Sequence, residues 1–223
     1  MIYKRRFLAI VAMLFLTIFL SCQKHEEPQP QPATTESKTV QPTQAKGLKE
    51  SADAKKWVDE GNRLTESGNN EEALKAYDKA INIAPDYAEA WYNKAISLEK
   101  LGRYKEALTA SEKAISLNPN FAEAWNYKGI VLSKMEMFEE AIKAYDKAIE
   151  LKPDFAWPWA NKAESLIKLG RNEEALMAYE KATEIAPGDP GNWYAKGMAY
   201  KKLDREEEAK KAFEKAKELG YKF

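Results

Sequence analysis

Residues 88–121 read AEAWYNKAISLEKLGRYKEALTASEKAISLNPNF, and residues 122–155 read AEAWNYKGIVLSKMEMFEEAIKAYDKAIELKPDF. The two segments have the same length of 34 residues and keep the same residue types at many of the same positions. Self-similarity at a fixed period is the sequence signature of a repeat protein, in which one structural unit stacks on the next. The two segments therefore predict a repeat architecture, and their pattern continues outward in both directions.

Tryptophan marks the repeat along the chain. It recurs every 34 residues, at Trp57, Trp91, Trp125, Trp159 and Trp193. Proline closes the first four units, at Pro85, Pro119, Pro153 and Pro187. Five units then follow one another without a gap, at residues 54–87, 88–121, 122–155, 156–189 and 190–223.

Each unit is expected to contain two helices. In the first unit the second helix carries an apolar stripe with helical period, made of Ala73, Leu74, Ala76, Tyr77, Ala80 and Ile81. Gly68, Gly102 and Gly170 stand between the two helices, where glycine can adopt the left-handed conformation that ends a helix. The proline cannot continue a helix. Asp86, Asn120 and Asp154 follow it and are expected to cap the next first helix.

Small residues indicate where the paired helices touch. They occupy the eighth position of every unit, as Gly61, Ala95, Gly129, Ala163 and Gly197. Large rings lie later in most of the units, as Tyr77, Tyr145, Tyr179 and Phe213. Small side chains beside such rings let antiparallel helices approach closely.

This pattern is similar to that of the tetratricopeptide repeat family, and the resemblance covers residues 54–223. It implies an all-α, right-handed superhelical solenoid of five helix-turn-helix repeats, whose first helices line a concave groove. The tryptophans are then interpreted as core residues and not as ligand-binding rings.

The fifth unit differs from the others at two positions. Lys210 and Lys217 occupy positions that hold mostly Leu or Ile in the preceding units. Terminal repeats need a polar outer face, so these lysines are expected to face water. A sixth repeat or an end-to-end dimer becomes less favoured, and a monomeric repeat domain is expected.

The resemblance also implies a binding surface, since ligands of the family contact set positions of the first helices. Carried onto this sequence, those positions give the partner-binding groove residues Tyr92, Asn93, Ile96, Asn126, Tyr127, Ile130, Trp157, Asn161, Glu164, Tyr194 and Met198. Trp157 can alternatively pack locally on Phe155 or Pro158. A column of lysines that includes Lys168 and Lys202 is interpreted as offsetting helix dipoles in preference to a ladder for an acidic partner.

The first 53 residues lie outside the repeats. Lys4, Arg5 and Arg6 precede an uncharged apolar stretch at residues 7–20, which is shorter than the ~20 residues of a spanning helix. Residues 1–21 are therefore expected to be a signal sequence, followed by lipid attachment at Cys22. An uncleaved membrane anchor is the alternative, and both place the repeats outside the cytoplasm, attached to a membrane. Residues 22–53 are expected to form a disordered tether rich in Pro, Gln and Thr.

Composition excludes several functions. The net charge is zero, which argues against a nucleic-acid partner. The chain has one Cys and one His, Cys22 and His25, so neither a metal site nor a cofactor is expected. The repeats show no paired catalytic carboxylates, and we expect no enzyme.

The favoured function is an exported adaptor or scaffold that binds a protein or peptide segment and assists an envelope complex. The alternative is a self-associating, membrane-attached structural protein.

Overall fold

The computed structural model describes the main chain of residues 42–222 and the side chains of residues 51–222. The expected signal sequence, Cys22 and residues 22–41 of the expected tether lie outside this range. The described residues form ten α-helices and no strand. These helices are α2 (Pro42–Glu66), α3 (Asn70–Ile83), α4 (Ala88–Lys100), α5 (Tyr104–Leu117), α6 (Ala122–Lys134), α7 (Phe138–Leu151), α8 (Ala156–Lys168), α9 (Asn172–Ile185), α10 (Pro190–Lys202) and α11 (Glu206–Glu218).

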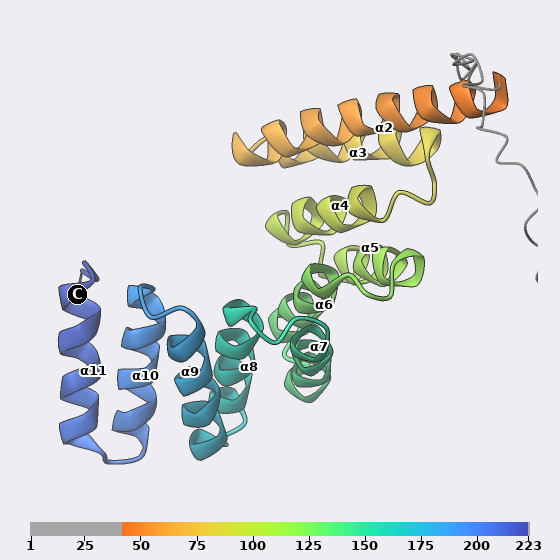
Figure 1. Ribbon diagram of the computed structural model, residues 1–223. Coiled ribbons are helices and arrows are strands. Elements are labelled where there is room, and N and C mark those ends of the chain that lie inside the picture. Colours follow the sequence, from red (N-terminus) through yellow and green to blue (C-terminus); the bar gives the residue numbers. More distant parts are fainter. Residues whose placement is uncertain (1–41, 223) are drawn as a thin grey trace, which may run out of the picture. The chain divides into compact units, whose positions relative to one another are not determined.

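Each helix packs mainly on the helices before and after it in the chain. The helices of one repeat pair with each other, as α2 with α3 and α4 with α5, and the second helix of each repeat packs on the first helix of the next (Figure 1). The prediction of an all-α solenoid of tetratricopeptide type is confirmed by this arrangement. Helix α2 begins at Pro42, twelve residues before the expected start at Ala54. Residues 42–53, which the sequence placed in the tether, are therefore helical.

Two local features explain this longer first helix. Proline fits the first turn of a helix because its missing N–H has no partner there. No further proline follows until Pro85, and the intervening residues include many Ala, Lys and Glu, which favour helix. The prediction of a disordered segment up to residue 53 was wrong for this part.

The turns agree with the glycine pattern, but the helix caps do not. Gly68, Gly102 and Gly170 have φ of +80°, +74° and +74°, as the left-handed conformation requires. The expected capping by Asp86, Asn120 and Asp154 was wrong, because α4, α6 and α8 begin after Tyr87, Phe121 and Phe155, which make no side-chain cap bond. In the described part of the chain, Asp189 before α10 does cap a first helix.

The core consists largely of alanine, with tyrosine fitted against glycine. Tyr77 and Tyr145 are both 1% exposed. A Cβ added at Gly61 or Gly129 would enter the ring of Tyr77 or Tyr145, respectively. Replacing these glycines would therefore require the rings to move, and the close approach of the two helices explains the small residue at this position.

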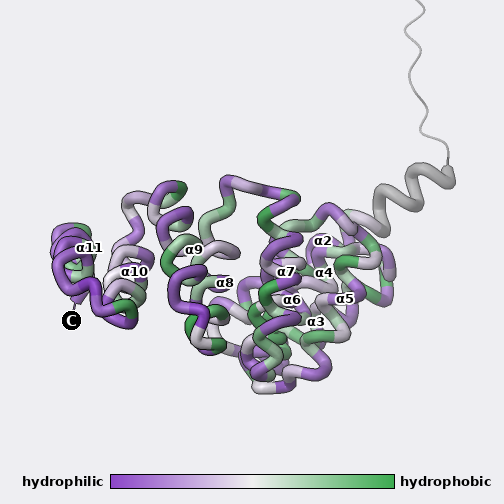
Figure 2. Tube along the Cα trace, turned by 90° about the horizontal axis from the view of Figure 1, so that it is seen from below, coloured by the Kyte–Doolittle hydropathy of each residue, from purple (hydrophilic) through white to green (hydrophobic). Residues whose placement is uncertain are grey.

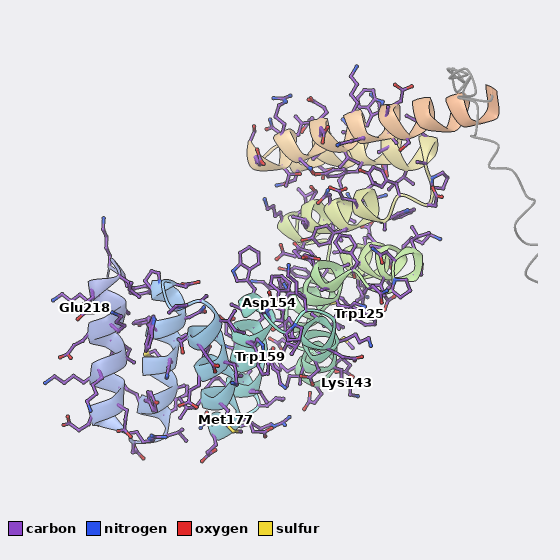
Figure 3. All side chains as sticks on the ribbon, in the orientation of Figure 1. Trp125, Lys143, Asp154, Trp159, Met177 and Glu218 are labelled. Atoms are coloured by element: carbon purple, nitrogen blue, oxygen red, sulfur yellow. The ribbon has the colours of Figure 1, made fainter. Side chains whose placement is uncertain are left out.

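The tryptophans contact the core without being fully buried, so the expectation that they are core residues needs correction. All five have intermediate exposure, and they pack against clusters of buried residues. In repeats two to five each indole Nε1 donates a hydrogen bond to a proline carbonyl six residues earlier, such as Trp125 to Pro119 (2.9 Å) and Trp159 to Pro153 (3.4 Å). Figure 3 labels Trp125 and Trp159 among the side chains.

Helix α11 has the polar outer face expected of the fifth unit. Lys210 and Lys217 are exposed, whereas Leu74, Ile142 and Leu176 at the position equivalent to Lys210 are buried. Purple, hydrophilic residues dominate α11 in Figure 2.

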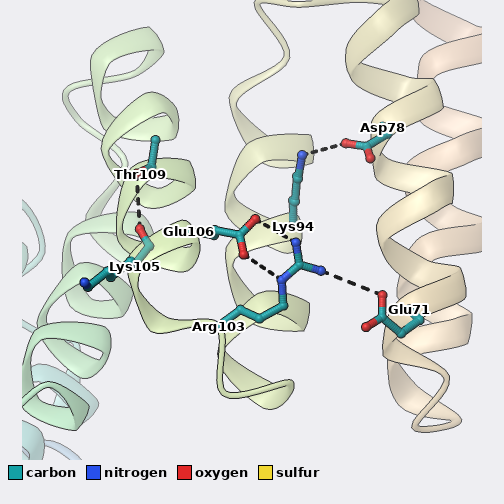
Figure 4. A network of polar contacts seen from close by, with 7 residues as sticks. All are labelled: Glu71, Asp78, Lys94, Arg103, Lys105, Glu106 and Thr109. Atoms are coloured by element: carbon teal, nitrogen blue, oxygen red, sulfur yellow. Dashed lines mark hydrogen bonds and ion pairs between the residues drawn. The ribbon is translucent and has the colours of Figure 1, made fainter.

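Ion pairs connect neighbouring helices on the surface. Lys94 Nζ lies 2.6 Å from Asp78 Oδ1, and Arg103 lies between Glu106 (2.6 Å) and Glu71 (3.8 Å), as Figure 4 shows. Lys128 with Glu112 and Lys162 with Asp146 repeat the first pair in later units. Exposed pairs of this kind contribute at most about 1 kcal/mol each, so the alanine core remains the main source of stability.

Candidate functional site

A hollow of about 650 Å³ is lined mainly by the first helices of repeats four and five, and we call it the repeat 4–5 hollow. Its size lies in the range of sites that hold small molecules or short segments. The residues that line it are Trp157, Ala160, Asn161, Glu164, Ile167, Lys168, Tyr179, Asp189, Gly191, Asn192, Tyr194, Ala195, Met198, Ala199, Lys202 and Tyr221. Five of the eleven predicted groove residues therefore meet in one place: Trp157, Asn161, Glu164, Tyr194 and Met198.

Trp157 stands out because it is a large ring left open to solvent. It lies in the first turn of α8. Pro158 is tolerated next to it because a backbone N–H at that position would have no acceptor within the helix. Its exposure is 65%, and its ring centroid is 5.9 Å from that of Phe155. The local contact with Phe155 therefore exists, but most of the indole remains available to a partner.

The opposite wall comes from α10 and the end of the chain. Tyr194 stacks on Tyr221 with ring centroids 4.4 Å apart and planes 13° from parallel, and its ring also lies 5.5 Å from that of Phe213. Met198, one turn further along α10, is 42% exposed. Aromatic and Met side chains offer apolar area together with a defined or adaptable shape, which suits recognition of another chain.

Polar groups are distributed unevenly around the hollow. Asp189 caps α10, since its Oδ1 accepts hydrogen bonds from the amide nitrogens of Gly191 (2.8 Å) and Asn192 (3.3 Å). Lys168 and Lys202 end α8 and α10. The hollow thus has the Asp189 carboxylate at the helix starts, and two ammonium groups at the helix ends with the Glu164 carboxylate one turn before Lys168.

The other predicted groove residues are placed differently. Asn126 is 4% and Asn93 9% exposed, and Asn161 donates a hydrogen bond to Asn126. The Tyr127 hydroxyl donates to Glu99 Oε2 (3.2 Å) and to the carbonyl of Ile96 (3.5 Å). Burial, followed by the charge of Glu99, raises the pKa of Tyr127. Asn126, Asn161 and Tyr127 therefore join neighbouring first helices. A role of these residues and of Asn93 in ligand binding stays a prediction.

Tyr92 and Ile130 line two smaller hollows. Tyr92 lies in one with Tyr87 and Phe121, and its ring is 5.0 Å from that of Phe121 and 5.8 Å from that of Tyr127. Burial, then the charge of Glu123, raises the pKa of Tyr92. Ile130 lies in another that also contains Asn161 and Glu164. The eleven residues therefore do not all line one hollow, although the hollow with Ile130 adjoins the repeat 4–5 hollow at Asn161 and Glu164.

Several residues of the repeat 4–5 hollow were not predicted from the sequence. Ala160, Ile167 and Lys168 occupy positions five, twelve and thirteen of their unit, and the family's contact positions would have found them. Asn192 and Tyr221 lie outside those positions. Only the stacking of Tyr221 on Tyr194 brings the end of the chain into the site, and no sequence spacing indicates it.

The described residues show neither a metal site nor a membrane span. No group of three or more His, Cys, Asp or Glu side chains within this range is placed to hold a metal ion. None of the helices α2–α11 has the length and apolar character needed to cross a bilayer.

Paired helices and the 34-residue period define a helical-repeat protein. Tetratricopeptide repeat profiles match residues 88–121, 122–155, 144–177 and 190–219, and a TPR repeat profile matches residues 61–102. Together they span more than half of the chain, which belongs to the tetratricopeptide repeat family.

Solved structures of the same kind agree with this assignment. The structure of MamA residues 41–end from Desulfovibrio magneticus RS-1 is 25% identical with a TM-score of 0.66, and the match covers 75% of this chain and 94% of that one. YrrB, described as a TPR protein with an unusual peptide-binding site, is 28% identical with a TM-score of 0.59, covering 80% and 91%. PilF of Pseudomonas aeruginosa, at 19% identity and a TM-score of 0.73 over 78% and 80%, shares the fold. A comparison with curated proteins gave no match.

Proposed function

We propose that this protein is an exported, lipid-anchored adaptor that binds a segment of a partner protein in the repeat 4–5 hollow and assists assembly of an envelope complex. The observation that carries the binding function is Trp157, an indole that is 65% exposed at the rim of a hollow. A large exposed ring in such a place gives much contact area to a partner at a small cost in conformational entropy.

Similarity to one repeat protein with a peptide-binding site supports the same function. YrrB is a TPR protein with a peptide-binding site, and the match covers most of both chains. Within the described residues no constellation of catalytic groups competes with this proposal, since the repeats contain no His or Cys.

Export and anchoring are supported by the sequence of the first 22 residues. Lys4, Arg5 and Arg6 precede an apolar stretch that ends directly before Ser21 and Cys22. A lipid on Cys22 would hold the repeat domain near a membrane and raise its effective concentration there. The intact mass of the mature protein tests this part: loss of residues 1–21 and a lipid on Cys22 are expected, and an unmodified full-length chain contradicts it.

Crosslinking in the producing cells tests the binding function. A photoreactive amino acid replacing Ala160, inside the hollow, is expected to give a discrete crosslinked partner. The same amino acid replacing Lys143, which is exposed on α7, is the control and should give none. Trp157→Ala should remove the Ala160 product, whereas an unchanged product would exclude the hollow. A product with the mass of a second copy would favour the self-associating alternative, which sedimentation of the full-length protein in detergent would test independently.

A further inference from the structure

Asn192 carries a polar group that the fold leaves unpaired. Its side chain lines the repeat 4–5 hollow and is 6% exposed. Its Nδ2 has no hydrogen-bond partner among the described residues. The other buried side-chain atom in this condition, Oδ1 of Asn70, does not line the hollow. A buried donor without an acceptor costs free energy of folding, so an amide kept in this state calls for an explanation outside the folded chain.

A ligand can supply the missing acceptor. The amide nitrogen has almost no accessible surface, so it must turn toward the hollow. The terminal torsion of asparagine is broad and soft, and this rotation is therefore inexpensive. After this rotation, Nδ2 of Asn192 can donate a hydrogen bond to a main-chain carbonyl of a bound peptide, because the protein itself provides no acceptor.

The two ends of the hollow differ in the chemistry that they offer. Trp157 lies in the first turn of α8, while Lys168 and Lys202 are the last residues of α8 and α10. Neither lysine makes an ion pair within residues 51–222. The residues three and four before Lys202 are Ala199 and Met198, so its own helix offers it no carboxylate at those spacings.

Two acidic groups, Asp189 and Glu164, also line the hollow, but each has a basic or amide partner close in the sequence. Asp189 is occupied in capping α10. Glu164 stands four residues before Lys168, a spacing at which the two side chains attract each other. Lys202 is therefore the charge best placed to receive an anionic group from outside.

Resting on the proposed function, we propose that the repeat 4–5 hollow binds an extended acidic peptide segment in one orientation. A main-chain carbonyl of the segment accepts from Asn192, an apolar side chain packs on Trp157, and an acidic side chain meets Lys168 and Lys202. The eleven residue steps from Trp157 to Lys168 span ~16 Å of helix at ~1.5 Å per residue. An extended peptide covers that distance in about five residues at ~3.3 Å each, which sets the spacing between its apolar and acidic side chains.

Binding of three labelled synthetic peptides to the full-length protein in mild detergent tests the orientation. The first is acetyl-Phe-Ser-Thr-Ser-Thr-Glu-amide, the second has the reverse order, and the third carries Lys in place of Glu. Fluorescence anisotropy is expected to show the first peptide binding roughly tenfold more tightly than either of the others. Equal binding of all three overturns the proposal.

Asn192→Leu separates a ligand-binding amide from a structural one. The variant removes an unpaired donor and keeps a side chain of similar size, so the thermal midpoint should stay the same or rise. Affinity for the first peptide should fall roughly three- to tenfold. A lower midpoint, or unchanged affinity, overturns the role of Asn192.

Charge reversal gives a second test that does not depend on the buried site. Lys202→Glu is expected to weaken binding of the first peptide and to strengthen binding of the Lys-containing peptide. Lys201→Glu is the matched control, because Lys201 is the preceding residue and lines a hollow on another face. Equal effects of the two variants contradict the proposed orientation.

Trp157→Ala distinguishes failure of this inference from failure of the proposed function. If it abolishes crosslinking to the partner while Asn192→Leu and Lys202→Glu leave that crosslinking unchanged, the hollow binds a partner in another way and the inference alone fails. If Trp157→Ala has no effect on the partner either, the proposed function fails as well.

Discussion

Nδ2 of Asn161 in α8 donates a 3.0 Å hydrogen bond to Oδ1 of Asn126 in α6. Both amides belong to the groove residues predicted from the sequence, yet here each serves the other. The bond joins the first helices of repeats three and four. These two asparagines therefore have a structural role beside any role in binding a ligand.

A double-mutant cycle measures this coupling. Asn126→Ala and Asn161→Ala should each destabilise the protein, and their combination should cost less than the sum by about 0.5–1.5 kcal/mol, the net value of one hydrogen bond. Urea unfolding followed by circular dichroism provides the free energies. Strict additivity would mean that the bond contributes nothing.

Gly129 is predicted to tolerate no side chain. A Cβ there would lie 2.6 Å from Cδ1 of Tyr145, in a ring that is 1% exposed and cannot move freely. Gly129→Ala should therefore cost about 1–3 kcal/mol, as overpacking does. Gly188→Ala is the control, because a Cβ at Gly188 meets nothing within 4 Å. Similar stabilities of the two variants in urea would show that the ring yields easily.

A glycine in either of two turns, at Glu136 or Asp204, is predicted to stabilise the protein. Glu136 and Asp204 have φ of 60° and 55°, where three other repeats place a glycine. Because the left-handed conformation penalises residues with a Cβ, Glu136→Gly and Asp204→Gly should each stabilise the protein by about 0.5–1 kcal/mol. Gly102→Ala should have the opposite sign. Thermal midpoints that fall in both glycine variants would refute this assignment.

Stability is predicted to fall at high pH, in part through Tyr87. Burial, followed by the carboxylate of Glu89, raises the pKa of Tyr87 to about 12. The folded state then keeps a proton that the unfolded chain loses near pH 10, so this contribution is complete below about pH 10 and is lost as the pH rises toward 12. Tyr87→Phe should reduce the slope of unfolding free energy against pH in this window. An unchanged slope would assign the effect to other tyrosines.

Two tryptophans of one helix are predicted to behave differently. Trp157 is 65% exposed, so Trp157→Ala should change stability by less than about 0.5 kcal/mol. Trp159 packs on the core and bonds the Pro153 carbonyl, and Trp159→Ala should cost about 2–4 kcal/mol. Urea unfolding compares them directly. A large loss in Trp157→Ala would mean that its contact with Phe155 holds the start of α8.

The sequence predicted the repeat units because period, proline and small residues all repeat together. The sequence-based prediction failed at the exact residues where helices begin. Asp86 and Asn120 are residue types that often cap helices. However, α4 and α6 start one residue too late for these side chains to cap them. The start of α2 was missed because residues 42–53 lack the apolar stripe that identifies the other helices, although their composition favours helix.

The site could be predicted only in part for a similar reason. Trp157 and Met198 were found because family contact positions point to an exposed face. The same rule selected Asn126 and Tyr127, but contacts between repeats bury Asn126 and cover part of Tyr127. Tyr221 and the unpaired amide of Asn192 depend on how α10 packs beside the end of the chain, and a one-dimensional spacing contains no such information.

Each indole from Trp91 onward is anchored to the carbonyl of the proline that closes the preceding unit. The same local contact therefore occurs at all four of these junctions, each time within seven residues of sequence. Because donor and acceptor lie so close in the chain, this bond directs the start of a unit without the entropy cost of closing a long loop.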